Sequence, residues 1–211
     1  MQAGCCYIVG AGQLCARGLQ PEAGDLLIAA DGGLQGLMRL GLKPRLVIGD
    51  MDSYSQPVRG LPLLRFPVRK NDTDISLAVR LGRQWGYRRF HLYGATGGPR
   101  EDHFIANMQL MAGLSRQGLD VRITAPSFDL YAVTDGDLRL QTKPGQMISV
   151  FSHSAQSRGV RLQGLSYEEQ GLHLCSAFPL GVSNQATGTS ARIGVERGTL
   201  LVYQQEDARL R

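Results

Sequence analysis

Residues 25–41 read DLLIAADGGLQGLMRLG and contain one complete strand-turn-helix pattern. An apolar run over 25–30 ends at Asp31-Gly32-Gly33, and apolar residues then recur at helical spacing until Gly41. A buried strand, a tight turn and a helix form the repeating unit of a parallel sheet covered by helices. We therefore predict an α/β fold for this part of the chain.

The same alternation continues to about residue 126. Apolar runs predict strands over residues 5–9, 25–30, 46–48, 63–66, 90–93 and 121–124. Helical spacing predicts helices over 34–40, 73–85 and 102–114, with Trp85 and Ile105 as candidates for buried faces. Gly10-Ala11-Gly12 after the first strand is interpreted as a strand-to-helix turn, because the third glycine of a dinucleotide fingerprint is missing. The expected architecture is a Rossmann-like parallel sheet.

The pattern changes after Pro126. Short alternating strands follow, separated by turn residues such as Asp135-Gly136-Asp137 and Pro144-Gly145, and helical periodicity is absent. About eight strands at this spacing predict a small antiparallel sandwich or barrel, with the sandwich as our choice. We expect two domains, an α/β domain over 1–126 and a β-sandwich over 127–211.

Composition limits the possible partners. The chain has 211 residues, of which 43% are hydrophobic, and a formal net charge of +5 without a long basic run. This distribution argues against a nucleic-acid partner and suits a substrate that carries several phosphates. No segment approaches the ~18 apolar residues of a membrane span, and no secretory leader is recognisable. A cytoplasmic protein without a membrane partner is expected.

Acidic residues gather where predicted strands end. Asp50 and Asp52 follow the strand over 46–48, and Asp74 opens a predicted helix. Carboxylates at the carboxyl ends of parallel strands converge on one edge of the sheet, and Mg²⁺ prefers such oxygen ligands. The alternative is an Asp-rich turn with side-chain caps.

Two further segments have the character of phosphate-binding loops. Lys70 precedes the predicted helix that begins near Thr73, and the glycine loop over 94–98 follows a strand. Helix N-termini and exposed backbone N–H groups attract phosphate oxygens, although Thr73 or Asn71 could equally be a helix cap. His103 and Asn107 share a helix face and could contact the same ligand, or His103 could be a surface residue near a cap.

Taken in order, these clusters resemble the thiamine pyrophosphokinase family. The family pattern contains Asp-Gly-Gly, Gly-Asp-x-Asp-Ser, Lys-Asp-x-Thr-Asp and a glycine loop followed by Asp-His and an Asn. This chain matches it at residues 31–33, 49–53, 70–74, 94–98, 102–103 and 107, and near its end at 181–184. It departs from the pattern at Asn71, where the family has Asp, and by one extra residue near Pro99.

The resemblance implies transfer of a diphosphate group from ATP to the hydroxyl of thiamine, with release of AMP. It implies Mg²⁺ ligands at Asp50, Asp52 and Asp74, and one of these or Asp102 as the base. The nucleotide would be bound by Asp31, Gly32, Gly33, Ser53, Lys70, Thr73, Gly97, Gly98, Arg100, His103 and Asn107. It also implies a homodimer in which Ser183 and Asn184 contact thiamine from the partner chain. Tyr203 is a candidate for stacking on thiamine, with core packing or an exposed strand end as the favoured alternative.

Two other functions remain open from the sequence alone. A sister enzyme could pyrophosphorylate a different alcohol such as a hydroxymethyl pterin, because related folds share the Gly-Asp-x-Asp-Ser cluster. The departure at Asn71 would fit a nucleotide- or thiamine-binding module without turnover. The 181–184 segment and the complete β domain favour thiamine as the acceptor.

Overall fold

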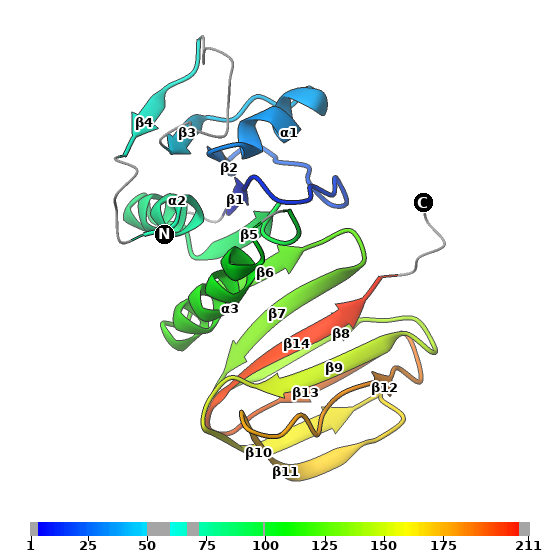
Figure 1. Cartoon of the computed structure of the whole chain (residues 1–211). Coiled ribbons are helices and arrows are strands. Elements are labelled where there is room, and N and C mark those ends of the chain that lie inside the picture. The colour runs from blue at the N-terminus through cyan, green and yellow to red at the C-terminus, as the bar shows by residue number, and fades with distance from the viewer. Residues whose placement is uncertain (1–3, 50–59, 67–71, 99, 207–211) are drawn as a thin grey trace. The chain divides into compact units, whose positions relative to one another are not determined.

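The structure is a computed structural model that describes residues 4–49, 60–66, 72–98 and 100–206 (Figure 1). The chain forms two compact units. The first comprises residues 1–110 and 119–126, and the second comprises 111–118 and 127–211. None of the helices in the described residues has the length and apolar character that a bilayer crossing requires.

The first unit contains a parallel sheet with the strand order β4-β3-β2-β1-β5-β6. Its strands are β1 (Cys5–Val9), β2 (Leu26–Ala30), β3 (Leu46–Gly49), β4 (Leu63–Arg65), β5 (Arg89–Tyr93) and β6 (Asp120–Thr124). Its helices are α1 (Gly33–Arg39), α2 (Asp74–Gln84) and α3 (Glu101–Arg116), of which residues 111–116 belong to the second unit. The predicted alternation of strands and helices is confirmed, with differences of at most two residues at element ends.

Helices pack on both faces of this sheet, and every residue of β2 is therefore buried. On one face, Leu34 and Leu37 of α1 join a core cluster with Val9. On the other face α2 lies so close that a Cβ added at Gly82 would be 2.8 Å from Cys6 Sγ. This two-sided cover explains why β2 and β3 are continuous apolar runs rather than alternating ones.

The second unit contains two antiparallel sheets. One has the order β12-β9-β14-β7 and the other β11-β10-β13-β8. The strands are β7 (Phe128–Thr134), β8 (Asp137–Gln141), β9 (Met147–Ser152), β10 (Gln156–Gln163), β11 (Glu169–Cys175), β12 (Asn184–Gln185), β13 (Ser190–Gly194) and β14 (Thr199–Gln205). Alternate residues from both sheets, such as Val202 and Ile193, form one shared core.

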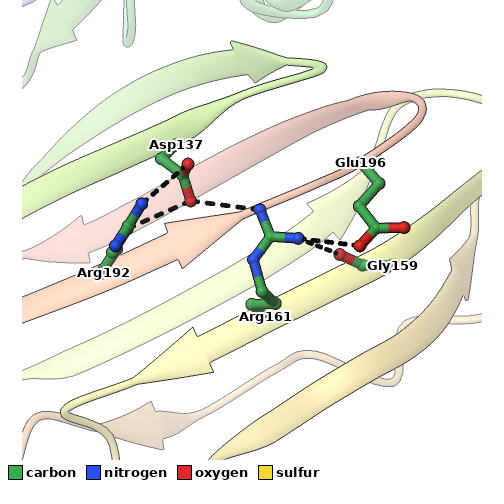
Figure 2. A network of polar contacts seen from close by, with 5 residues as sticks. All are labelled: Asp137, Gly159, Arg161, Arg192 and Glu196. Carbon is green, nitrogen blue, oxygen red and sulfur yellow. Dashed lines mark hydrogen bonds and ion pairs between the residues drawn. The ribbon is translucent and has the colours of Figure 1, made fainter.

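A charged network crosses the outer face of β8, β13 and β10 (Figure 2). Asp137 accepts hydrogen bonds from Arg192 Nη2 at 3.0 Å and from Arg161 Nη2 at 3.4 Å, and Arg161 Nη1 also bonds Glu196 at 3.2 Å. Gly194 lies between them, and a Cβ there would be 2.3 Å from Asp137 Oδ1. The glycine thus leaves the space that lets Arg161 reach across β13.

Three expectations were wrong in detail. Ile105 is 57% exposed because the buried stripe of α3 runs through Asn107, Met111 and Leu114, on the opposite side of the helix. Trp85 is 44% exposed because it is the C-cap residue of α2, beyond its last buried turn. The turn at residues 10–12 leads into no helix, because backbone bonds to the β5 loop hold the chain after β1.

Candidate functional site

The carboxyl ends of β2 and β3 place Asp31 against Gly49. Asp31 has a φ of 49°, and its backbone N–H donates to the Ile48 carbonyl at 2.7 Å. Its side chain is only 9% exposed, and Oδ1 has no hydrogen-bond partner in the described part of the chain. A buried carboxylate oxygen without a partner is costly, and such groups are commonly completed by a ligand, a water or an ion.

Gly33 owes its place in the Asp-Gly-Gly turn to steric fit. A Cβ at Gly33 would lie 1.9 Å from the Val9 carbonyl oxygen, so only glycine allows α1 to begin this close to the end of β1. Gly32 is the N-cap of α1 and supplies no side chain to the cap. The turn therefore brings backbone, rather than further side chains, next to Asp31.

The glycine loop after β5 is fixed by hydrogen bonds to its carbonyl groups. Gly10, Gly12 and Gln13 donate their backbone N–H groups to the carbonyls of residues 93, 94 and 96, at 2.8, 2.8 and 2.7 Å. The loop tip, Gly97 and Gly98, is exposed and in the left-handed region, with φ values of 68° and 87°. The 10–12 turn therefore holds the glycine loop in place. The sequence motif, which lacks a third glycine, did not indicate this role.

Asn107 anchors the same loop from α3. Its side chain is 2% exposed, and Nδ2 donates to the Ala95 carbonyl at 2.8 Å. His103, one turn earlier, is exposed, and its backbone N–H donates to the Arg100 carbonyl at 3.1 Å. His103 and Asn107, which the sequence places on one helix face, thus have different surroundings. Asn107 holds the loop, and His103 is exposed to solvent.

The N-terminus of α2 also lies near the end of β1. A Cβ added at Gly10 would be 2.8 Å from Ile75 Cδ1. Thr73 is the N-cap, since its Oγ1 accepts from the Ser76 N–H at 3.2 Å, as the alternative interpretation expected. Asp74 opens the helix, where the helix dipole favours an anionic side chain.

Arg100 and Asp102 form a bidentate ion pair at the start of α3. Arg100 Nε and Nη2 bond the two carboxylate oxygens at 3.0 and 2.8 Å, and both side chains are well exposed. The hydrogen bond from Arg100 lowers the pKa of Asp102 from its ordinary value of 3.8. Asp102 in this arrangement is a weaker base than an unpaired aspartate.

Several predicted site residues lie outside the described part of the chain. These are Asp50, Asp52, Ser53, Lys70 and Asn71, together with Pro99. The described residues alone bring together no group of three or more His, Cys, Asp or Glu side chains that could hold a metal ion. Asp31, Asp72 and Asp74 are described carboxylates close in sequence or in the sheet to the segments that carry Asp50, Asp52 and Lys70.

In the second unit, Ser183 and Asn184 have different surroundings. Ser183 is exposed, has a φ of 62°, and its N–H donates to Ser149 Oγ at 3.0 Å. Asn184 is buried, and its amide accepts from the Tyr167 N–H at 3.0 Å and donates to the Tyr167 carbonyl at 2.8 Å. Asn184 thereby fixes the turn at Tyr167, whose side chain is 73% exposed. No local sequence pattern indicates the contact between Asn184 and Tyr167.

Tyr203 packs within the second unit. Its ring lies 4.9 Å from that of Phe128 between centroids, and partial burial raises the pKa of its hydroxyl. Tyr203 is partly buried and lies outside the core cluster of the second unit. The exposed aromatic next to Asn184 is Tyr167, which the sequence did not single out.

Comparison with known proteins points to one family. Residues 21–123 match the family model described as "Thiamin pyrophosphokinase, catalytic domain". The chain is thus similar to the thiamine pyrophosphokinase family. The matched segment runs from just before β2 into β6 and includes Asp31, Gly49 and the glycine loop.

Members of this family resemble the chain over nearly its whole length. It is 24% identical over 189 residues to thiamine pyrophosphokinase of Bacillus subtilis (strain 168), covering 86% of this chain and 88% of that protein. The crystal structure of the Bacillus subtilis enzyme has a TM-score of 0.86 at 23% identity, covering 96% and 99% of the two chains. Thiamin pyrophosphokinase from Candida albicans has a TM-score of 0.79 at 13% identity, covering 97% and 89%. These structures share the fold of both units.

Proposed function

We propose that this protein transfers a diphosphate group from ATP to the hydroxyl of thiamine, giving thiamine diphosphate and AMP. The observation that carries the proposal is the buried Asp31 Oδ1, which lacks a partner in the described residues. It lies at the carboxyl edge of a parallel sheet, where α/β folds bind ligands, and inside the segment matched by the catalytic-domain model. The proposal places the nucleotide at this edge.

The carboxylates fit a hard divalent cation. We assign Mg²⁺ to Asp50, Asp52 and Asp74, because oxygen ligands suit it and Asp31 leaves a carboxylate oxygen unsatisfied beside the strand that leads to Asp50. When bound, Mg²⁺ neutralises charge on the phosphate oxygens. Asp50, Asp52, Asp74 or Asp102 would accept the thiamine hydroxyl proton, and the hydrogen bond from Arg100 lowers the pKa of Asp102.

The nucleotide phosphates would bind along the glycine-rich edge. The exposed tip at Gly97 and Gly98 offers backbone to an anion, and Arg100 and His103 are exposed on the neighbouring helix start. Arg100 can exchange Asp102 for a phosphate, because its guanidinium binds either anion in the same bidentate geometry. Asp31, Gly32, Gly33, Ser53, Lys70 and Thr73 complete the nucleotide site, with Asn107 holding the loop.

Thiamine is assigned to the second unit of a partner chain. Phe178, Leu180 and Val182 are 64%, 54% and 46% exposed immediately before Ser183 and Asn184. Exposed apolar side chains in one segment are typical of an interface, and a homodimer would cover them. In this scheme the Rossmann-like domain over 1–126 binds ATP and Mg²⁺, and the β-sandwich over 127–211 contributes to the thiamine site.

The test is a product analysis. Purified protein is incubated with ATP, MgCl₂ and either thiamine or 6-hydroxymethyl-dihydropterin, and the products are identified by mass spectrometry. Thiamine diphosphate with one equivalent of AMP is the expected result. AMP release with the pterin alone would make the chain the sister enzyme, and no product with either acceptor would contradict transfer.

A further inference from the structure

A cavity lies at the opposite, amino-terminal edge of the parallel sheet. Its volume is about 500 Å³, within the usual range for small-molecule sites. The segments that lead into β2, β3 and β4 line it, including Pro21, Lys43, Arg45 and Leu61. It is a separate site from the nucleotide edge, because these strands run away from it toward Asp31 and Gly49.

The floor of this cavity is apolar. Leu27, Leu42 and Leu61 line it, and all three belong to or pack against the core cluster that includes Leu34 and Leu37 of α1. Prolines at 21, 44 and 62 add rigid apolar walls with no backbone N–H to satisfy. A bound apolar group would therefore extend an existing core and leave few polar groups of the wall without water.

The rim of the cavity is cationic. Lys43 and Arg45 are both exposed, and neither side chain forms an ion pair or hydrogen bond with another residue in the described chain. Asp25 is the acidic residue of the lining, and its two oxygens accept from the Cys5 N–H at 2.7 Å and the Glu22 N–H at 2.9 Å. Both Asp25 carboxylate oxygens thus accept backbone hydrogen bonds, while Lys43 and Arg45 can bind a ligand.

We propose that this cavity binds a small organic anion, with an apolar ring system on the leucine floor and a carboxylate or similar head group between Lys43 and Arg45. The guanidinium of Arg45 suits a planar two-oxygen head group, and the mobile Lys43 ammonium adds a point charge. The ligand leaves the nucleotide edge accessible. Binding here does not depend on the proposed diphosphate transfer.

The experiment follows ¹H–¹⁵N NMR shifts of the full chain during titration with 2-naphthoate. Two further probes separate the contributions of the ring and the carboxylate to binding. 2-Naphthalenemethanol keeps the ring system without the charge, and acetate keeps the carboxylate without the ring. We expect saturable shifts at Leu27, Leu42, Lys43, Arg45 and Leu61 with naphthoate, and at least tenfold weaker binding of each other probe. ATP with Mg²⁺ should leave these shifts unchanged.

A double variant tests the cationic rim. Lys43→Gln/Arg45→Gln should weaken naphthoate binding at least tenfold and leave binding of the neutral alcohol unchanged, whereas Arg39→Gln on exposed α1 surface should change neither. Equal affinity for acid and alcohol, shifts confined to other residues, or no effect of the double variant would each overturn the proposal. Because binding is read without turnover, failure of the transferase assay would leave this result intact.

Discussion

Gly49 leaves the space in which Asp31 adopts its left-handed backbone. A Cβ at residue 49 would lie 3.1 Å from Asp31 Cα and 3.2 Å from its Cβ, and Gly49 itself has a φ of 151°. The Asp31 conformation, with φ of 49°, is uncommon for a residue with a side chain. Strained backbone of this kind persists where the neighbouring structure imposes it. At Asp31 that neighbouring structure is the end of β3, which pairs with β2.

Gly49→Ala should destabilise the fold by about 1–3 kcal/mol, since it adds strain at a positive φ and a close contact with Asp31. Urea denaturation measures the change. Gly113→Ala in α3 is the matched control: an added Cβ there meets nothing within 4 Å, so stability should rise by about 0.5–1 kcal/mol. Equal effects of the two alanines would refute the steric account of Gly49.

Asn107→Ala should lower stability by about 1–3 kcal/mol, because the buried Ala95 carbonyl loses its side-chain donor. If the glycine loop binds phosphate, the KM for ATP should also rise, while the KM for thiamine changes less. Gln109→Ala, at an exposed position of the same helix, is the control for changes in helix propensity. An unchanged KM for ATP in a folded Asn107→Ala protein would separate the loop from nucleotide binding.

Arg100→Gln should raise the pKa of Asp102 toward its ordinary value of 3.8, because the hydrogen bond from Arg100 is the main cause of its lowering. The carboxyl ¹³C shift of Asp102 during an acid titration reports the change directly. A lowered pKa keeps the carboxylate charged to more acidic pH, so the variant should become protonated at higher pH than the parent. An identical titration curve would mean that the ion pair is absent in solution.

Asp137→Asn should destabilise the second unit by about 1 kcal/mol at pH 7, since Asp137 accepts from both Arg192 and Arg161. Hydrogen bonds and charge from Arg192, then Arg161, lower the pKa of Asp137 below 3.8. Its contribution is therefore complete above that value and is lost as the pH falls through the folded-state pKa. Urea denaturation at several pH values should show the difference between parent and variant shrinking in acid.

Glu169→Gln is the control for the Asp137 variant. Glu169 is exposed on β11 of the same sheet and forms no ion pair within the described residues. Its replacement should change stability by less than about 0.5 kcal/mol at every pH. If both variants behaved alike, the network in Figure 2 would contribute nothing specific to stability.

The sequence predicted the elements of the first unit well, because continuous apolar runs such as Leu26–Ala30 and amphipathic spacing are local signals. It did not predict that Asn107 would occupy the buried stripe of α3 or that Asn184 would hold the Tyr167 turn. Both asparagines form hydrogen bonds with backbone groups that are distant in the sequence. Such contacts produce no periodic pattern of residues that a sequence analysis could detect. The 10–12 turn was misjudged for the same reason, since its partner is the loop after β5.

Asp31→Asn tests whether the buried Asp31 carboxylate serves the proposed diphosphate transfer. If Asp31 Oδ1 is buried for a ligand, removing its charge should leave stability unchanged or higher and reduce thiamine diphosphate formation at least a hundredfold. Asp135→Asn is the matched control, because Asp135 also has a positive φ, of 46°, and its Oδ1 accepts from the Gly198 N–H. Turnover of Asp31→Asn within threefold of the parent, measured by AMP release, would contradict the account.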